Sequence, residues 1–390
     1  MMRRLGLSDR AMSPLLKAGT ILVLAAVVGS VSARETRQVT ELREALEAIR
    51  AQHDLPALAG AIVGPRGLET VATVGVRKAD DPEAPPATDD DLWHLGSCGK
   101  AMTATMIARL VEAGTLRFEQ TLGESFPEHA DAMPETLRGI TLEQLLTHRS
   151  GLPANFNQWP FATDADRTHP NDARRKVLRA TLDVELLHDP GSAFVYSNWG
   201  YVLAGHIAES NDPQGRPYER LMREEVFEPL GIKTAGFGGT GTTGQIDQPW
   251  PHEAGGAPAP SNGPEVDNSP VMAPAGTMHM TLADWSRFVA DHLNGHFARG
   301  ELLKQSTYRR LHTPVGDDQA MGWISVERGW AGVGDNNRAL THSGDNTMNR
   351  AVVWAAPERR FAVLVVTNRS GTHAACDAAA WRLIQTKLNR

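Results

Sequence analysis

Leu95-Gly96-Ser97-Cys98-Gly99-Lys100 places a serine three residues before a lysine, at the start of a helical pattern. The apolar residues that follow at helical spacing are Met102, Met106, Ile107, Leu110 and Val111. Because residues three apart share one side of a helix, the spacing predicts Ser97 in the first turn of a mostly buried helix, with Lys100 one turn further on. A motif this short occurs about once by chance in a chain of this length, and its alternative interpretation is an exposed serine beside a solvated lysine.

The two side chains form a chemically useful pair if they meet. A serine hydroxyl is a poor nucleophile until a neighbouring base removes its proton. A lysine in partly apolar surroundings can lose its own proton near neutral pH, and the free N–H groups at a helix start favour developing negative charge. Ser97 and Lys100 are therefore candidates for a nucleophile and its base.

A second candidate motif is Tyr196-Ser197-Asn198. A tyrosine beside a lysine ammonium is biased toward its phenolate and can relay protons. The amide of Asn198 offers both a donor and an acceptor to a substrate. The alternative interpretation is a core tyrosine whose neighbour Ser197 or Asn198 caps the helix predicted over residues 201–207.

The third candidate is Thr341-His342-Ser343-Gly344-Asp345, which precedes a predicted C-terminal hairpin. A glycine at position 344 lets a substrate backbone lie close alongside a strand. Ser343 can donate a hydrogen bond, and His342 can present a donor or a partial charge. The alternative interpretation is an ordinary strand end that leads into a turn.

The motifs Ser97-x-x-Lys100, Tyr196-x-Asn198 and His342-x-Gly344 occur in one order and at suitable separations. Further matching stretches are LLTHRSGLP at residues 145–153, EPLGI at 228–232, and PAGT at 274–277 followed by Asp284 and Phe288. In these features the chain resembles the superfamily of serine hydrolases that contains the penicillin-binding proteins, the D-alanyl-D-alanine carboxypeptidases and the class C β-lactamases. The resemblance covers approximately residues 40–388.

This resemblance implies an enzyme that forms an acyl-enzyme intermediate with an amide or ester substrate. Ser97 would be acylated, and Lys100 and Tyr196 would share proton transfer. The backbone N–H groups of Ser97 and Asp345 would bind the oxyanion, while Asn198 and Ser343 would hold the substrate. The residues expected to bind the substrate or the oxyanion are Asn198, His342, Ser343, Gly344 and Asp345.

His342 departs from the established β-lactamases of this superfamily, which usually carry lysine here to hold a substrate carboxylate. A free histidine has a pKa of about 6.5 and is largely neutral at neutral pH. We therefore expect a weaker dependence on a substrate carboxylate, and an activity of the D-amino-acid carboxypeptidase or esterase type. Whether Arg149, Arg350 or another cation replaces the lysine is open. Asp345 would repel an oxyanion unless its carboxylate points away or is paired.

Other functions use the same nucleophile and stay open: a β-lactamase proper, a penicillin-binding sensor that is acylated without turnover, and a family member that has lost catalysis. The G-x-G-x-x-G at residues 236–241 lacks a following helix pattern. Leu95 stands where a G-x-S-x-G elbow needs glycine, and we interpret His148 as structural rather than as a catalytic base. No metal or cofactor is expected, because the sequence has no H-E-x-x-H and only two cysteines, Cys98 and Cys376.

Periodicity and turn residues predict the order of the elements. They are a helix capped by Thr40 that carries Leu42, Leu46 and Ile49 on one face, a hairpin of strands 56–64 and 68–76, helices through the middle, an irregular segment at 240–274, a hairpin of strands 351–356 and 361–367, and a helix at 373–388. The expected fold is α/β (α+β) and β-lactamase/transpeptidase-like: an antiparallel sheet flanked by helices, with a mainly helical insertion. One hydrolase domain is expected over residues 36–390, with its sheet half at about 36–95 and 300–390 and its helical half at about 96–299.

Residues 1–33 have the layout of a secretory signal peptide, with basic residues, an apolar run at 18–29 and small residues at 31–33. The run has about twelve residues, whereas a bilayer span needs about twenty. Cleavage near Ala33, no stable membrane anchor, and a periplasmic or secreted location are expected, and an uncleaved tether is the alternative.

The net charge expected for the mature chain bears on the classes of partner it can bind. Residues 1–33 hold four basic residues and one acidic residue, so their removal changes the formal charge from −7 to −10. An acidic body argues against nucleic acid and anionic membranes as partners. A small-molecule or peptide substrate is the expected partner, and the sequence leaves the oligomeric state open.

Overall fold

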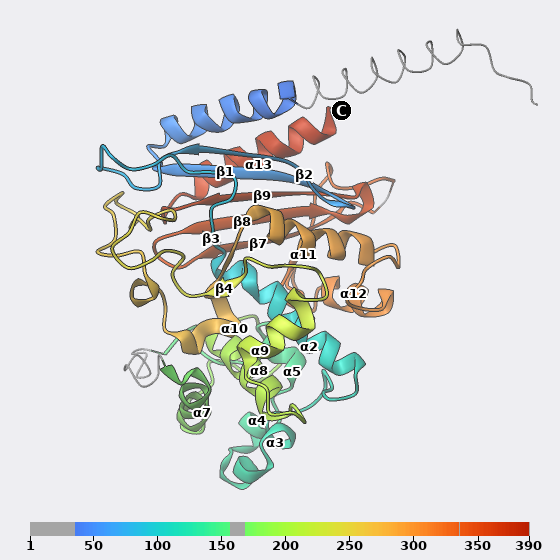
Figure 1. Cartoon of the computed structure of the whole chain (residues 1–390). Coiled ribbons are helices and arrows are strands. Elements are labelled where there is room, and N and C mark those ends of the chain that lie inside the picture. The colour runs from blue at the N-terminus through green and yellow to red at the C-terminus, as the bar shows by residue number, and fades with distance from the viewer. Residues whose placement is uncertain (1–35, 157–167, 335, 390) are drawn as a thin grey trace, which may run out of the picture.

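The computed structural model describes residues 36–156, 168–334 and 336–389. The predicted signal peptide, residues 1–33, lies outside the described residues. Within those three ranges, no helix is both long and apolar enough to span a bilayer. Figure 1 shows a sheet with helices packed across one face and a larger, mainly helical part on the other side.

The main sheet has six antiparallel strands, which come from both ends of the described chain. They are β1 (Ala57–Gly64), β2 (Gly67–Gly75), β6 (Ile324–Glu327), β7 (Arg338–Asp345), β8 (Arg350–Ala356) and β9 (Phe361–Thr367). Their spatial order is β2-β1-β9-β8-β7-β6, so that Leu58 of β1 lies opposite Thr367 of β9. Both predicted hairpins, β1–β2 and β8–β9, are confirmed.

Both faces of the sheet are covered, which explains why β1 is buried along its whole length. A helix over residues 36–52 and α13 (His373–Leu388) share an apolar core with one face, and α11 (Leu282–Gly295) packs against β1, β2 and β9 on the other. The first helix begins before Thr40, so the prediction that Thr40 caps it is wrong. The Thr40 hydroxyl instead donates to the Thr36 carbonyl at 3.0 Å, inside the helix.

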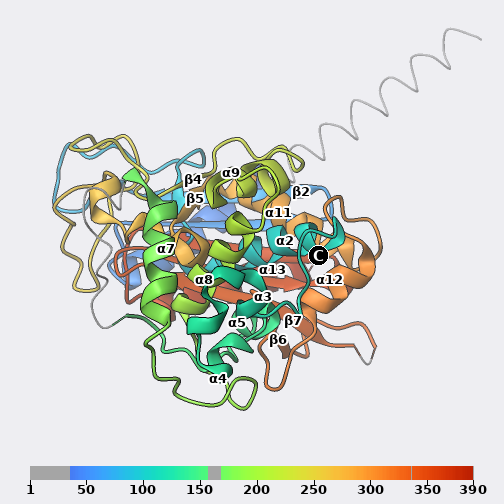
Figure 2. The ribbon, with the colours of Figure 1, turned by 90° about the horizontal axis from the view of Figure 1, so that it is seen from below.

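The helical part fills the view from below in Figure 2. Its helices are α2 (Gly99–Glu112), α3 (Leu122–Ser125), α4 (Glu135–Arg138), α5 (Leu142–Leu146), α7 (Pro170–Thr181), α8 (Asn198–Ser210), α9 (Tyr218–Met222) and α10 (Ala273–Gly276), with α12 (Gln305–His312) beside α2 and α11. The predicted buried helix is confirmed as α2, but it begins at Gly99, so the prediction that Ser97 lies in its first turn is wrong and Ser97 lies just before it. Helix α2 is buried along most of its length because α8, α9, α10 and α12 contact it. A small second sheet, in the order β3 (Trp93–His94), β5 (Met278–Met280) and β4 (Gly236–Phe237), leads the chain into α2.

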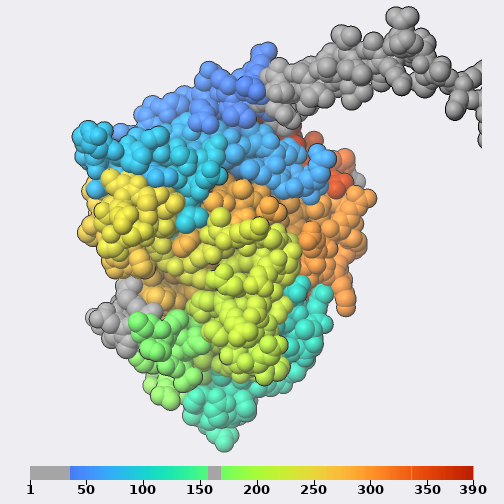
Figure 3. Space-filling view, viewed as in Figure 1, coloured from blue at the N-terminus to red at the C-terminus, as the bar shows by residue number. Residues whose placement is uncertain are grey.

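The segment 240–274 is irregular, as predicted, apart from short 3₁₀ helices at Pro264–Val266 and Pro270–Met272 and the start of α10. It covers one side of the molecule, where it appears in yellow in Figure 3. The backbone N–H of His252 donates to the Asn368 carbonyl at 2.9 Å, and the Asn368 amide donates to the Trp250 carbonyl at 2.9 Å. These bonds tie the segment to the end of β9.

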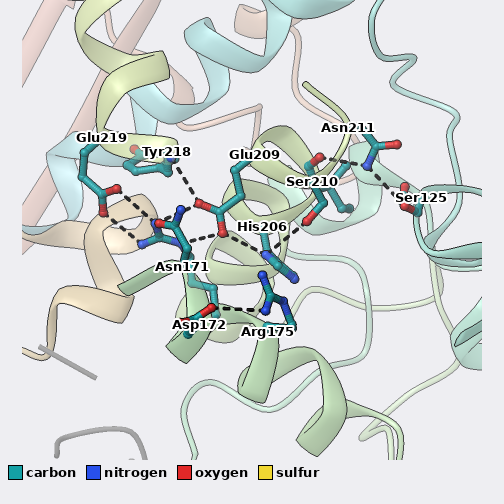
Figure 4. Close-up of polar contacts among 12 residues, drawn as sticks. Ser125, Asn171, Asp172, Arg175, His206, Glu209, Ser210, Asn211, Tyr218 and Glu219 are labelled. Atoms are coloured by element: carbon teal, nitrogen blue, oxygen red, sulfur yellow. Dashed lines mark hydrogen bonds and ion pairs between the residues drawn. The ribbon is translucent and has the colours of Figure 1, made fainter. Parts of the chain in front are cut away.

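A buried ion network joins α7, α8 and α9 (Figure 4). The guanidinium of Arg174 donates to both carboxylate oxygens of Glu209, at 3.0 and 2.9 Å, and to Glu219 at 3.0 and 3.1 Å. His206, at 2.8 Å, and the backbone N–H of Tyr218, at 3.1 Å, complete the surroundings of Glu209. Burial would raise the pKa of Glu209, but the charge of Arg174 and the hydrogen bond with His206 outweigh it and lower the pKa to about 2. Glu209 therefore stays ionised in the interior.

Candidate active site

Ser97 lies in a short 3₁₀ helix, η1 (Gly96–Cys98), that runs directly into α2. Gly96 has a φ of +50°, a left-handed conformation that favours glycine. Strand β7 passes close by: a Cβ atom at Gly344 would lie 2.0 Å from the Leu95 carbonyl oxygen and 2.7 Å from the Ser97 nitrogen. Glycine at position 344 therefore allows the end of β7 to lie against the backbone of the candidate nucleophile.

Lys100 lies one turn along the chain from Ser97, and its side chain is 0% exposed. Its Nζ is 2.9 Å from Ser97 Oγ, 2.7 Å from Asn198 Oδ1 and 2.5 Å from the Ala275 carbonyl oxygen. Burial lowers the pKa of Lys100 to about 7. A large fraction of the protein therefore carries this lysine as a neutral amine at neutral pH.

A neutral amine fits these three contacts, because it has two N–H donors and one lone pair. Two of its neighbours, the oxygens of Asn198 and Ala275, can only accept hydrogen bonds. The orientation of the Asn198 amide is fixed, since its Nδ2 donates to Asn155 Oδ1 at 2.9 Å. The lone pair of Lys100 is then left for the Ser97 hydroxyl, which is the arrangement that a general base requires.

The Tyr196 hydroxyl is also hydrogen-bonded to the Ser97 side chain, and Lys100 Nζ lies 5.0 Å from the centre of the tyrosine ring. The three side chains therefore meet around one serine oxygen. Burial raises the pKa of Tyr196 well above its usual value. The prediction that the neighbouring lysine favours the phenolate is wrong, because burial of the phenol raises its pKa and so favours the neutral form.

His148 supports the tyrosine from the loop that follows α5. Its ring stacks on the Tyr196 ring, with 4.3 Å between centroids, and its Nδ1 accepts a hydrogen bond from the Ser197 backbone N–H at 3.0 Å. Burial lowers the pKa of His148 well below its usual value, so the ring is neutral. These contacts fit the structural interpretation of this histidine.

His342 is buried close to Lys100, while Ser343 beside it is exposed. Burial first, and then the charge of Lys100, lower the pKa of His342 to about 4. The neutral ring donates from Nδ1 to the Ser343 carbonyl at 2.8 Å. His342 therefore offers no full positive charge to a substrate. Arg149, one of the cations considered for that purpose, donates to the Gly191 carbonyl instead.

Asp345, whose backbone N–H is the second expected oxyanion donor, has a partnered carboxylate. Its Oδ1 accepts from the Thr347 backbone N–H and from the Ser370 hydroxyl, both at 2.7 Å. Arg350 Nη1 lies 3.7 Å from Oδ2. Because its carboxylate is paired, Asp345 is not expected to repel an oxyanion. Arg350, the second cation considered as a replacement for the missing lysine, lies beside this carboxylate.

The Beta-lactamase family profile matches residues 42–387, nearly all of the described chain. The chain belongs to the Beta-lactamase family. This is a family of serine hydrolases, and one of the relatives found is itself a penicillin-binding protein. Penicillin-binding protein 4 of Amycolatopsis lactamdurans is 29% identical over 254 residues, which are 65% of this chain and 63% of that protein.

Two solved structures of Beta-lactamase-like proteins share the fold. The octameric penicillin-binding protein homologue from Pyrococcus abyssi superposes with a TM-score of 0.70 at 20% identity, covering 89% of this chain and 77% of that one. D-alanine carboxypeptidase AmpC from Burkholderia cenocepacia superposes with a TM-score of 0.69 at 19% identity, covering 89% and 99%. The predicted fold class is therefore confirmed.

Two contacts of this Beta-lactamase family site were not predicted from the sequence, the Ala275 carbonyl and the Asn155 amide. Both lie in or just after stretches that carried the resemblance, at residues 274–277 and 145–153. A backbone carbonyl leaves no side-chain signature, so no motif could mark Ala275 as a partner of Lys100. Over the ranges that the structure describes, no group of three or more histidine, cysteine or acidic side chains could hold a metal ion.

Proposed function

We propose that this protein hydrolyses an amide or ester bond through an acyl-enzyme formed on Ser97. The observation that carries the proposal is the distance of 2.9 Å between Ser97 Oγ and Nζ of the fully buried Lys100. A catalytic base works best when its pKa lies near the operating pH. The pKa of Lys100, lowered by burial to about 7, meets that requirement.

In the acylation step, the Ser97 oxygen attacks the substrate carbonyl carbon while its proton passes to Lys100 Nζ. The carbonyl oxygen becomes an oxyanion, which accepts hydrogen bonds from the backbone N–H groups of Ser97 and Asp345. The oxyanion then collapses to the acyl-enzyme, and the C–N or C–O bond to the leaving group breaks. Tyr196, as a phenol, gives its proton to that leaving amine or alkoxide and regains one from the Lys100 ammonium. Water then attacks the acyl-enzyme with the reverse proton movements, and the free serine is restored.

The proposed substrate is a D-amino-acid peptide, cleaved in a carboxypeptidase-like reaction, or an ester. A buried, neutral His342 gives no full charge with which to hold a carboxylate, which favours these substrates over rapid β-lactam turnover. A penicillin-binding protein among the relatives and a D-alanine carboxypeptidase among the structural neighbours support the peptide substrate. The leader predicted at residues 1–33 supports our proposal that the protein acts in the periplasm or outside the cell.

One experiment separates this hydrolase from a β-lactamase and from a penicillin-binding sensor. Purified protein is incubated in parallel with p-nitrophenyl acetate, a peptide ending in D-alanyl-D-alanine, and a fluorescent penicillin, and any adduct is located by mass spectrometry. We expect turnover of the ester or the peptide, and an adduct on the fragment that contains Ser97. Rapid penicillin turnover would instead identify a β-lactamase, and stable labelling without any turnover a sensor. An adduct on another residue would refute the mechanism.

The rate is expected to rise with pH through about 7, the pKa of Lys100. Only the neutral amine can accept the serine proton, and its fraction grows as the pH passes the pKa. The pKa of His342 is lowered by burial to about 4, burial lowers the pKa of His148 well below its usual value, and burial raises the pKa of Tyr196, so these groups titrate elsewhere. Measurement of kcat/KM from roughly pH 5 to pH 9 should show one rising limb. A rate that falls across this range contradicts the assignment of Lys100 as the base.

A further inference from the structure

Three buried polar side chains adjoin the expected oxyanion donors but take no part in the proposed chemistry. His94 ends β3, shortly before Ser97 in the sequence, and Asn346 directly follows Asp345. Asp267 comes from the irregular segment 240–274, far from both in the sequence. We call His94, Asp267 and Asn346 the Asp267 cluster, and all three are buried.

Asp267 joins the other two residues through its two carboxylate oxygens. Its Oδ2 lies 2.9 Å from Nε2 of His94, and its Oδ1 accepts a hydrogen bond from Asn346 Nδ2 at 2.9 Å. Burial would raise the pKa of Asp267, but the net effect of its surroundings, which include hydrogen bonds from His94 and Asn346, holds the pKa below its usual value. Asp267 is therefore a buried carboxylate that binds two donors at once.

The hydrogen bonds of His94 define its protonation. Its Nδ1 accepts from the backbone N–H of Gly96 at 3.1 Å, so this nitrogen carries the lone pair. The ring proton is then on Nε2, which donates to Asp267. Because both nitrogens are engaged, His94 has none free to act as a base for Ser97. The ring links the carboxylate to the main chain one residue before the nucleophile.

Asn346 supports the turn after β7 from the other side of the cluster. Its Oδ1 accepts from the backbone N–H groups of Met348, at 3.2 Å, and Asn349, at 2.8 Å. The turn contains Thr347 at a φ of +74°, a conformation that residues other than glycine rarely adopt. Its shape therefore depends on side-chain hydrogen bonds such as these. Asp345, the second donor, directly precedes the turn.

The two pieces of main chain held by the cluster lie against each other. A Cβ atom at Gly96 would lie 2.7 Å from the backbone nitrogen of Asp345. Gly96 in turn is the residue just before Ser97, the first donor. A shift of either piece would therefore change the relative position of the two N–H groups.

We propose that the Asp267 cluster positions the backbone N–H groups of Ser97 and Asp345 for the oxyanion. This inference rests on the proposed function, because an oxyanion forms there only when Ser97 attacks a carbonyl. Preorganised donors are effective when they point to the place where the charge develops. A displacement of about 1 Å at a reacting centre can cost about 100-fold in rate. The cluster acts through the backbone, and its side chains are positioning residues that do not touch the substrate.

Asp267→Asn tests this proposal, because it keeps the shape of the side chain and removes one acceptor. The new amide nitrogen must face a donor, either His94 or Asn346, and one of the two links is lost. We expect kcat/KM for p-nitrophenyl acetate to fall about 10- to 100-fold. The affinity for phenylboronic acid should fall by the same factor, because its tetrahedral serine adduct resembles the transition state, while KM should change by less than about threefold.

Asp291→Asn is the matched control. Asp291 is also buried and accepts from Tyr308 and from the Glu301 backbone N–H, but it lies in α11, outside the site. This variant should lower the midpoint of thermal unfolding without changing the boronic acid affinity. If Asp267→Asn does not fold, Asn346→Ala provides the same test from the other end of the cluster.

A parallel loss of kcat/KM and boronic acid affinity supports the inference. An unchanged boronic acid affinity in a folded Asp267→Asn or Asn346→Ala protein overturns it, whatever the loss of stability. A different result would refute the proposed function: Ser97→Ala would retain the turnover of the unmodified protein. If turnover requires Ser97 but is insensitive to both cluster variants, the inference alone is wrong.

Discussion

Replacing Ser97 with alanine is expected to lower kcat/KM for a p-nitrophenyl ester by at least about 10³-fold. The change removes the hydroxyl that lies 2.9 Å from Lys100 Nζ and is hydrogen-bonded to Tyr196. Steady-state turnover and covalent labelling by a fluorophosphonate should disappear together. Retention of labelling in the variant would show that another residue is the nucleophile.

Lys100→Met should reduce the rate by about 10²- to 10⁴-fold, the usual contribution of a general base. Because the serine and the lysine act as one unit, the double variant should be no slower than the slower single variant. Thermal unfolding of each protein checks that the fold is retained. Losses that multiply in the double variant would mean that the two residues act independently, which contradicts the proposed proton transfer.

Arg174→Met is expected to lower the free energy of unfolding by about 3–5 kcal/mol, because it removes one partner of a buried ion pair. The Arg174 side chain is 0% exposed, and that of Glu209 is 5% exposed. Methionine fills much of the same space but leaves the Glu209 carboxylate in the interior without its main compensating charge. Urea unfolding followed by circular dichroism measures the loss.

The neighbouring Arg175 gives a matched control. Its side chain is 57% exposed, and its Nη1 lies 3.2 Å from Asp172 Oδ1. Figure 4 draws this pair beside the buried network. An exposed pair of this kind contributes about 1 kcal/mol or less, so Arg175→Met should change the stability little. Equal losses in the two variants would show that the buried network contributes no more than a surface pair.

The strands and helices that carry the candidate site could be predicted because their signals are local. The turn at residues 64–67 and the apolar runs on either side of it specify a hairpin without reference to the rest of the chain. The start of the first helix was predicted wrongly because Thr40 has the residue type of a cap. Its hydroxyl instead donates to a backbone carbonyl inside the helix. The residue type alone does not show whether a threonine caps a helix or forms such a bond within it.

The site depends more on contacts between distant segments. The residues Ser97, Lys100 and Tyr196 could be identified from short sequence motifs. The protonation of Tyr196, however, depends on how deeply the fold buries its hydroxyl, which a motif does not show. Asp267 contacts His94 across 173 positions, and neither residue belongs to a recognisable pattern. Because such partners have no local sequence signal, they can be identified only from the tertiary structure.

The spatial order of the main sheet has a consequence for biosynthesis. Strand β1 lies between β2 and β9, and the Ala57 backbone N–H bonds to the Asn368 side chain across 311 positions. During translation one edge of β1 in the β1–β2 hairpin therefore stays unpaired until residues 361–367 have left the ribosome. Pairing over such a separation is slow compared with local folding. Nascent fragments that end before residue 361 lack the neighbouring strand altogether, which makes them candidates for chaperone binding or degradation rather than for folding.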